Sequence, residues 1–218
     1  MIAAELQKVR AAIHGSLLFA ALLIVSAGFP SLPWPWYPVL PVLVYGGIVL
    51  VVGPLRRTAP KLAVGRIGGW PLVCATILAL TTASVLVGFQ AVIRPELKDL
   101  AAKLRVDRFG SLLLAGVCFS VVNAAIEELI FRGILWDLVS DEWNKGMALG
   151  VTAVLFGVGH LQGYPPGPIG ACMAGLYGVM LGTLRWWTGG LGLATACHVG
   201  ADATIFCILA GTGAFDTQ

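Results

Sequence analysis

The chain contains seven apolar segments, and these limit what it can fold into more than any other feature. The clearest of them, residues 70–93, contains no Asp, Glu, Lys or Arg. About 20 consecutive apolar residues suffice to cross the hydrocarbon core of a bilayer as an α-helix. Only 11% of the 218 residues are charged, whereas soluble domains carry about 25%. We therefore expect an all-α fold, a polytopic bundle of helices integrated into a membrane.

We predict about seven transmembrane segments within a single domain that covers residues 1–218. Residues 11–109 form an N-terminal part, and residues 110–210 form the core part of that domain. The segments fall at about residues 11–29, 39–55, 70–93, 110–139, 147–161, 169–187 and 191–210.

The most charged stretch of the chain, residues 94–108, lies between the third and fourth segments. Its apolar residues recur at helical spacing, which predicts an amphipathic helix lying on the membrane surface. An ordinary solvated connector is the alternative. By the positive-inside rule, Lys and Arg in the other loops favour a cytoplasmic N-terminus. The five basic residues of 94–108 then fall on the opposite side of the membrane and contradict this rule.

Net charge and cysteine usage exclude several functional classes. The net charge of +3 is too small to indicate binding to nucleic acid. The five cysteines fall singly inside apolar runs, and no pair has Cys-x-x-Cys spacing. This pattern favours neither a disulfide framework nor a zinc knuckle, so we interpret the cysteines as small packing residues.

Residues 124–133 carry two adjacent carboxylates and an arginine inside an otherwise apolar run. An ionisable side chain in a bilayer is costly, about 2.5 to 3.5 kcal/mol on insertion scales, and usually serves a function. On a helix, Glu128 and Arg132 stand at i and i+4 and can pair. Glu127 then faces another direction, with Asn123 one turn before it. The alternative is a structural ion pair with a spare carboxylate.

Two histidines lie deep in later segments. Glu127 and His160 stand about fourteen residues before and after the polar turn at 141–145. An antiparallel hairpin therefore places both at about the same depth, ~20 Å from that turn. His198 and Asp202 share one helical face at i and i+4, as do Phe156 and His160. His14, near the start of the first segment, is expected to have no polar company.

These residue types suit hydrolysis without a covalent intermediate. Glu127 and His160 could bind and deprotonate one water, while His198, oriented by Asp202, donates to the developing oxyanion. Phe156 could form a wall of the site. The sequence has no Gly-x-Ser-x-Gly elbow and no His-Glu-x-x-His zinc motif. A metal held by Glu127, His160 and His198 remains an alternative on ligand types alone.

Over residues 111–209 the chain resembles the CPBP family of CAAX prenyl endopeptidases and bacteriocin-processing enzymes, also called Abi proteins. These are described as glutamic-type intramembrane proteases. The resemblance rests on three motifs in order, Glu127-Glu128-x-x-x-Arg132, Phe156-x-x-x-His160 and His198-x-x-x-Asp202.

The resemblance implies a role for each motif residue. Glu127 and His160 would activate water, and His198 and Asp202 would stabilise the oxyanion. Supporting roles fall to Glu128 and Arg132 by resemblance, and to Phe156 and Asn123 by position. The resemblance also implies a helical fold with a cavity open to one side of the bilayer, residues 110–210 as the catalytic core, and no required metal or cofactor.

The expected substrate is a membrane-embedded or membrane-proximal peptide, in contact with the lipid bilayer and without nucleic acid. Eukaryotic members of the family trim prenylated C-termini, whereas a chain this small looks bacterial and would occupy the inner membrane. A CAAX-like end, a C-terminal sorting tail or a bacteriocin-type peptide would each fit. Two other functions remain open, a non-catalytic scaffold or immunity protein and a small proton-coupled transporter with Glu127 in its relay.

Overall fold

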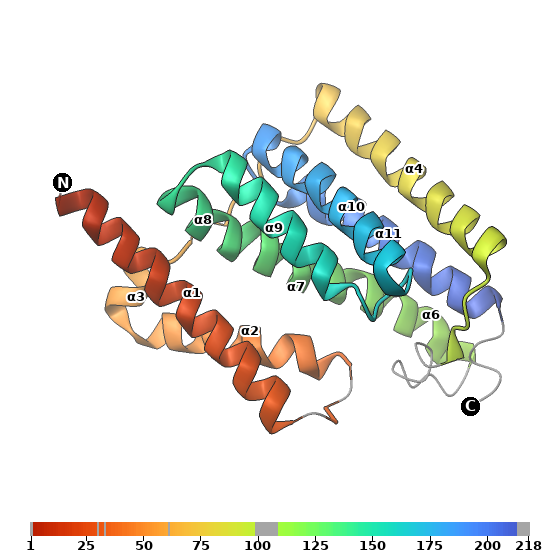
Figure 1. The fold of residues 1–218 in the computed structure, drawn as a ribbon, viewed down its shortest axis with the longest axis horizontal. Helices are drawn as coiled ribbons and strands as arrows, with labels where there is room; N and C mark the ends of the chain where they lie inside the picture. Colours follow the sequence, from red (N-terminus) through yellow and green to blue (C-terminus); the bar gives the residue numbers. More distant parts are fainter. Residues whose placement is uncertain (1, 30, 33, 61, 99–108, 213–218) are drawn as a thin grey trace.

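The computed structural model of the chain describes residues 2–29, 31–32, 34–60, 62–98 and 109–212 (Figure 1). Helices account for most of these residues, and none of them is in a β-strand. The predicted all-α class is therefore confirmed. Most of the stretch predicted as an interfacial helix, residues 99–108, lies outside the described residues.

Three N-terminal helices form a layer beside the rest of the bundle. They are α1 (Ile2–Gly28), α2 (Trp36–Val51) and the short α3 (Gly53–Thr58). Leu18 of α1 and Tyr45 and Val49 of α2 pack in one buried cluster with apolar side chains from residues 126–138. This cluster attaches the N-terminal layer to the helix that carries Glu127.

A long helical run follows residue 108 and crosses the whole bundle. It consists of α6 (Phe109–Cys118), η1 (Phe119–Asn123), α7 (Ala124–Glu128), η2 (Leu129–Leu135) and α8 (Trp136–Glu142), where η marks π-helical turns. Single-turn π segments inside α-helices are frequent at functional sites. Here the two π segments lie immediately before and after the five residues of α7, which include both adjacent glutamates.

Three further helices complete the core, α9 (Lys145–Gly159), α10 (Gly167–Thr188) and α11 (Gly192–Gly211). The turn before α9 lies where the polar residues predicted it, and the Asn144 side chain caps α9 by accepting from the backbone N of Met147 at 2.9 Å. The α9 and α10 backbones approach closely, because a Cβ added at Gly157 would lie 2.7 Å from the carbonyl oxygen of Ala171. Small residues at this contact are typical of membrane helix pairs.

The helix α4 (Gly69–Ile93) packs beside α11 on the far side of the core (Figure 1). The linker before it is held against the turn between α10 and α11. Backbone N–H groups of Leu191 and Gly192 donate to the carbonyls of Ala63 and Val64 at 2.8 and 2.9 Å. Gly65 has φ +83°, and a Cβ there would lie 2.6 Å from the backbone N of Gly190. The linker thereby fixes the position at which α4 begins.

Four described helices are long and apolar enough to cross a membrane, at Gly69–Ile93, Leu112–Glu142, Gly167–Thr188 and Gly192–Gly211. The other three predicted segments correspond to shorter apolar helices, at Ala12–Gly28, Trp36–Val51 and Lys145–Gly159. Each predicted segment is thus an apolar helix. The predicted number of about seven spans is not confirmed, because three of the helices are shorter than a full crossing requires.

Candidate active site

Glu127 stands at the centre of the candidate site, between two histidines from other parts of the bundle. Its Oε2 atom lies 3.7 Å from Nε2 of His160 at the end of α9, and 3.6 Å from Nε2 of His198 on α11. Oε2 itself is buried and has no hydrogen-bond partner. The side chains of Glu127 and His160 are each 22% exposed. The predicted approach of Glu127 to His160 across the hairpin is therefore confirmed.

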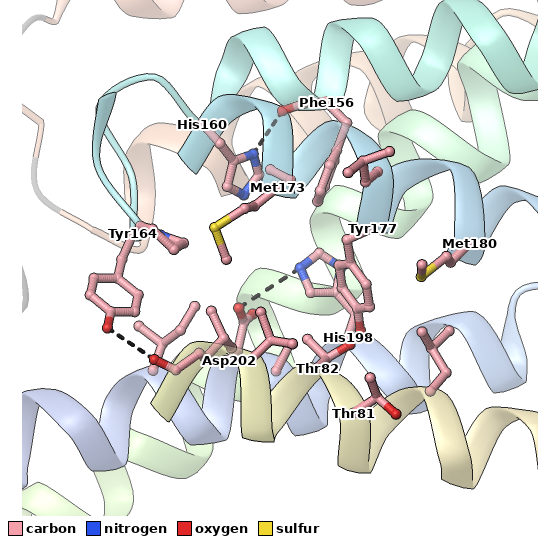
Figure 2. A pocket seen from close by; sticks show the side chains of 18 residues that line it. Thr81, Thr82, Phe156, His160, Tyr164, Met173, Tyr177, Met180, His198 and Asp202 are labelled. Atoms are coloured by element: carbon pink, nitrogen blue, oxygen red, sulfur yellow. Dashed lines mark hydrogen bonds and ion pairs between the residues drawn. The ribbon is translucent and has the colours of Figure 1, made fainter. Parts of the chain in front are cut away.

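The contact at Nδ1 fixes which nitrogen of His160 can accept a proton. Nδ1 lies 2.7 Å from the carbonyl oxygen of Phe156, one turn earlier (Figure 2). A carbonyl oxygen can only accept, so Nδ1 carries the hydrogen and donates it. In the neutral ring Nε2 then has a free lone pair, and this lone pair faces the Glu127 carboxylate.

Glu128 and Arg132 form the ion pair that the sequence predicted. The guanidinium Nη1 donates to Oε1 of Glu128 at 2.7 Å, and Nη2 donates to the carbonyl of Gly178 on α10 at 3.1 Å. Both side chains are essentially inaccessible to solvent. A buried pair with hydrogen bonds in good geometry can offset its desolvation, whereas either partner alone cannot.

His198 is held by Glu128 as well as by the expected Asp202. Its Nδ1 lies 2.9 Å from Oε1 of Glu128, and its Nε2 lies 3.8 Å from Oδ1 of Asp202. The sequence had assigned the orienting role to Asp202 and only the pairing with arginine to Glu128. In the structure Glu128 has the shorter contact, because α11 crosses the helical run at α7.

Asn123 joins the first and the last motif. Its amide nitrogen donates to Oε1 of Glu127 at 3.1 Å and to Oδ2 of Asp202 at 3.2 Å. The two carboxylates come from α7 and α11, and an amide between them supplies donors to both. Position one turn before Glu127 was the only sequence signal for this residue.

Phe156 packs against three groups of the site. Its ring centroid lies 4.3 Å from Cζ of Arg132, 4.3 Å from the ring of His160 and 5.6 Å from the ring of His198. The ring is almost completely buried. A cation over an aromatic face is attracted by the ring quadrupole, so Phe156 both stabilises Arg132 and confines the two imidazoles.

A cavity of about 260 Å³ adjoins these groups (Figure 2). His160, His198 and Asp202 line it together with mainly apolar side chains of α4, α10 and α11. Tyr164, in the loop after α9, closes it on one side and donates from its hydroxyl to Oε1 of Gln90 on α4 at 3.0 Å. Burial raises the pKa of Tyr164 to about 12, so this hydroxyl remains a donor at neutral pH.

The remaining candidate residues are distributed as follows. His14 lies on α1 in the N-terminal layer. The expectation that it lacks polar company is wrong, since Nδ1 contacts the hydroxyl of Tyr45 at 2.9 Å and Nε2 that of Thr58 at 3.1 Å. Among the described residues, no group of three or more His, Cys, Asp or Glu side chains could hold a metal ion. The set Glu127, His160 and His198 is thus not such a group.

Sequence reasoning missed the residues that line the cavity from α4 and α10. Thr81 and Thr82 stand in the middle of α4, and Tyr177 stands opposite on α10 (Figure 2). None of them belongs to a motif, and α4 contains no Asp, Glu, Lys, Arg or His. A pair of threonines at the centre of the most apolar candidate span was the one available signal.

Part of the chain matches a known protein family. Residues 109–204 match the family model of the Rce1-like type II CAAX prenyl endopeptidases. No curated protein and no solved structure matches the chain. The matched region contains all three motifs and runs from α6 into α11. Residues 109–204 are therefore similar to the CPBP family, the protease family of the Rce1-like CAAX prenyl endopeptidases, and the apolar helices indicate an integral membrane protein.

Proposed function

We propose that the protein is a glutamic-type intramembrane endopeptidase, which hydrolyses a peptide bond with a water activated by Glu127 and His160. One observation carries this proposal. Oε2 of Glu127 and the lone pair of His160 Nε2 face each other at 3.7 Å, and Oε2 has no hydrogen-bond partner. Two acceptors in this arrangement can receive the two hydrogens of one water molecule.

In the proposed step the water oxygen attacks the scissile carbonyl carbon while one of its protons passes to Glu127. The carbonyl π electrons move onto the carbonyl oxygen, which becomes an oxyanion. Collapse of this intermediate re-forms the carbonyl and breaks the C–N bond, and the leaving nitrogen takes up the proton. The second water proton remains on the new carboxyl group, which then ionises, so the products are a new C-terminal carboxylate and a protonated amine. A positioned general base contributes about 10²–10⁴-fold to such a reaction.

His198 would stabilise the oxyanion from the other side of Glu127. Its Nδ1 is directed at Glu128, so Nε2 is the nitrogen that faces the reaction space. Donation from Nε2 requires a ring protonated on both nitrogens, a form compatible with the three carboxylates around it. Asp202 contacts the same nitrogen at 3.8 Å and would hold it in place.

The proposal also concerns the membrane and the substrate. The three shorter apolar helices would complete a bundle of seven spans in one domain, with residues 11–109 as the N-terminal part and residues 110–210 as the catalytic core. The site would act on a membrane-embedded or membrane-proximal peptide in a bacterial inner membrane. The mainly apolar lining of the cavity supports a substrate that is itself apolar near the scissile bond.

The test compares wild type with Glu127→Gln in native membranes, by mass spectrometry of protein C-termini and small membrane peptides. Glutamine keeps the size and the acceptor for Asn123 but cannot take the proton. We expect a defined set of termini to be lost in this variant and retained in Glu96→Gln, which alters an exposed glutamate outside the core. The outcome against proteolysis is that no terminus differs between the two membranes, although cells with Glu127→Gln behave like cells that lack the protein. That outcome would favour binding or transport.

A further inference from the structure

Two threonines stand at the middle of α4 and line the cavity. Thr81 lies midway between the helix ends Gly69 and Ile93, about 18 Å from each at 1.5 Å per residue. Thr82 follows it, and both line the cavity that contains His160 and His198. The helix is the most apolar of the four candidate spans.

These two hydroxyls differ from the other hydroxyls of the same helix. Thr76 donates to the carbonyl of Leu72, and Ser84 donates to that of Leu80, each at 2.9 Å. Such bonds to the i−4 carbonyl are the usual way for a membrane helix to satisfy a hydroxyl. Within the described structure Thr81 and Thr82 make no such bond.

A third unpaired hydroxyl belongs to Tyr177 on α10. Its oxygen is buried without a hydrogen-bond partner, and its ring lines the cavity across from α4 (Figure 2). The ring also meets the imidazole of His198 edge-on, with centroids 6.1 Å apart. An unpaired hydroxyl in an apolar environment costs roughly 1–3 kcal/mol by mutational estimates. This cost applies to the buried hydroxyl of Tyr177, whereas Thr81 is exposed and Thr82 half-buried at the cavity. The three hydroxyls line one cavity and are free to donate to a bound molecule.

We propose that Thr81, Thr82 and Tyr177 form a hydroxyl ledge that binds backbone carbonyls of the peptide substrate. The ledge deepens the proposed function and rests on it. A membrane peptide must unwind to expose a scissile bond, and its freed carbonyls then need donors in a region without water. Lipid acyl chains carry no acceptor, and headgroups lie about 15 Å away from the bilayer centre. Backbone recognition would also make cleavage tolerant of the side chains bound there.

The α4 half of the ledge lies outside the region that the family model matches. The family match begins at residue 109, and α4 ends at Ile93. Thr81 and Thr82 would therefore bind substrate from the part of the chain before the matched region. The proposed hydrolytic groups lie within the matched region.

The experiment removes each hydroxyl with the least change of shape, in Thr81→Val, Thr82→Val and Tyr177→Phe. Matched controls on the same helix are Thr76→Val and Ser84→Ala, whose hydroxyls bond their own helix. The probe is a synthetic peptide whose sequence spans a cleavage site that is lost in Glu127→Gln membranes. The peptide and the purified protein are reconstituted together in liposomes. We expect KM to rise about tenfold for each ledge variant with kcat nearly unchanged, because carbonyls away from the scissile bond are bound equally before and during reaction.

Thermal unfolding completes the test, because the ledge hydroxyls have no partner in the free protein. The ledge variants should melt at or above the wild-type temperature. If the ledge variants have the same KM as the control variants, the proposed role of the ledge in binding is wrong, and the proposed function is unaffected. A ledge variant that melts lower than wild type at unchanged KM would show a structural role and overturn the ledge equally. If no terminus depends on Glu127 in membranes, the proposed function fails, and the ledge with it.

Discussion

Nδ1 of His198 lies 2.9 Å from Oε1 of Glu128, the same oxygen that accepts from Arg132 at 2.7 Å. One carboxylate oxygen therefore connects the ion pair of the first motif with the histidine of the last. The contact sets the orientation of the His198 ring, so that Nε2 faces Glu127 at 3.6 Å. Glu128 is thus the residue through which the fold of the bundle determines the geometry of the site.

This arrangement predicts that Glu128 and Arg132 contribute more to stability than Glu127 does. Glu128→Ala leaves the buried Arg132 without its carboxylate, and Arg132→Ala leaves the buried Glu128 with His198 as its remaining partner. We expect a loss of about 3–5 kcal/mol when a buried pair is broken in this way, with the larger loss from Glu128→Ala. Glu127→Gln keeps its size and is partly exposed, so it should change stability little. Thermal unfolding in detergent micelles measures the difference. Equal melting temperatures for all three variants would refute the structural role of the pair.

The depth and pairing of the motif residues were predictable from the sequence because helix geometry fixes them. Rise per residue placed Glu127 opposite His160, and i,i+4 spacing paired Glu128 with Arg132. The contact between Glu128 and His198 was not predictable, because it depends on where α11 crosses α7. No spacing along one helix contains that information.

The order of apolar helices was likewise predictable from composition, but their local geometry was not. The two π-helical segments next to α7 follow from tertiary packing and leave no mark in the hydrophobic pattern. His14 looked isolated because Tyr45 and Thr58 are distant in sequence. Thr81 and Thr82 passed unnoticed since threonine is ordinary in a membrane helix when it bonds its own backbone.

Phe156 is predicted to influence the reaction through Arg132 and both histidines. Phe156→Leu keeps an apolar side chain but removes the aromatic face 4.3 Å from the guanidinium. We expect product formation to fall at least tenfold, with a stability loss of about 1–2 kcal/mol. Phe131→Leu is the matched control, since its ring lies 5.9 Å from the same guanidinium. Equal product rates in the two variants would contradict this role.

His14 is predicted to stabilise the N-terminal layer without affecting the reaction. The hydroxyl of Thr58 donates to the carbonyls of Pro54 and Leu55, so it accepts from Nε2 of His14, and Nδ1 accepts from Tyr45. His14→Leu leaves the buried Tyr45 hydroxyl unpaired, at a cost of about 1–3 kcal/mol.

The double variant His14→Leu with Tyr45→Phe tests this explanation. Replacing both partners by apolar groups can be nearly neutral, so the second change should restore part of the stability that the first removes. Unfolding in micelles measures both variants, and product formation below the melting temperature should equal that of wild type. A double variant less stable than His14→Leu alone would show that the hydrogen bond is not the cause.

The close approach of α9 and α10 predicts opposite effects of the same substitution at two glycines of α9. A Cβ at Gly157 would lie 2.7 Å from the backbone oxygen of Ala171, whereas a Cβ at Gly150 meets nothing within 4 Å. Gly157→Ala must separate the helices, at about 1–3 kcal/mol, and should slow product formation because α9 positions Phe156 and His160. Gly150→Ala should be neutral or stabilise by about 0.5–1 kcal/mol, since alanine favours the helix. Thermal unfolding and product formation are measured for both variants. If Gly157→Ala is as stable and as active as Gly150→Ala, close packing of α9 on α10 does not position His160.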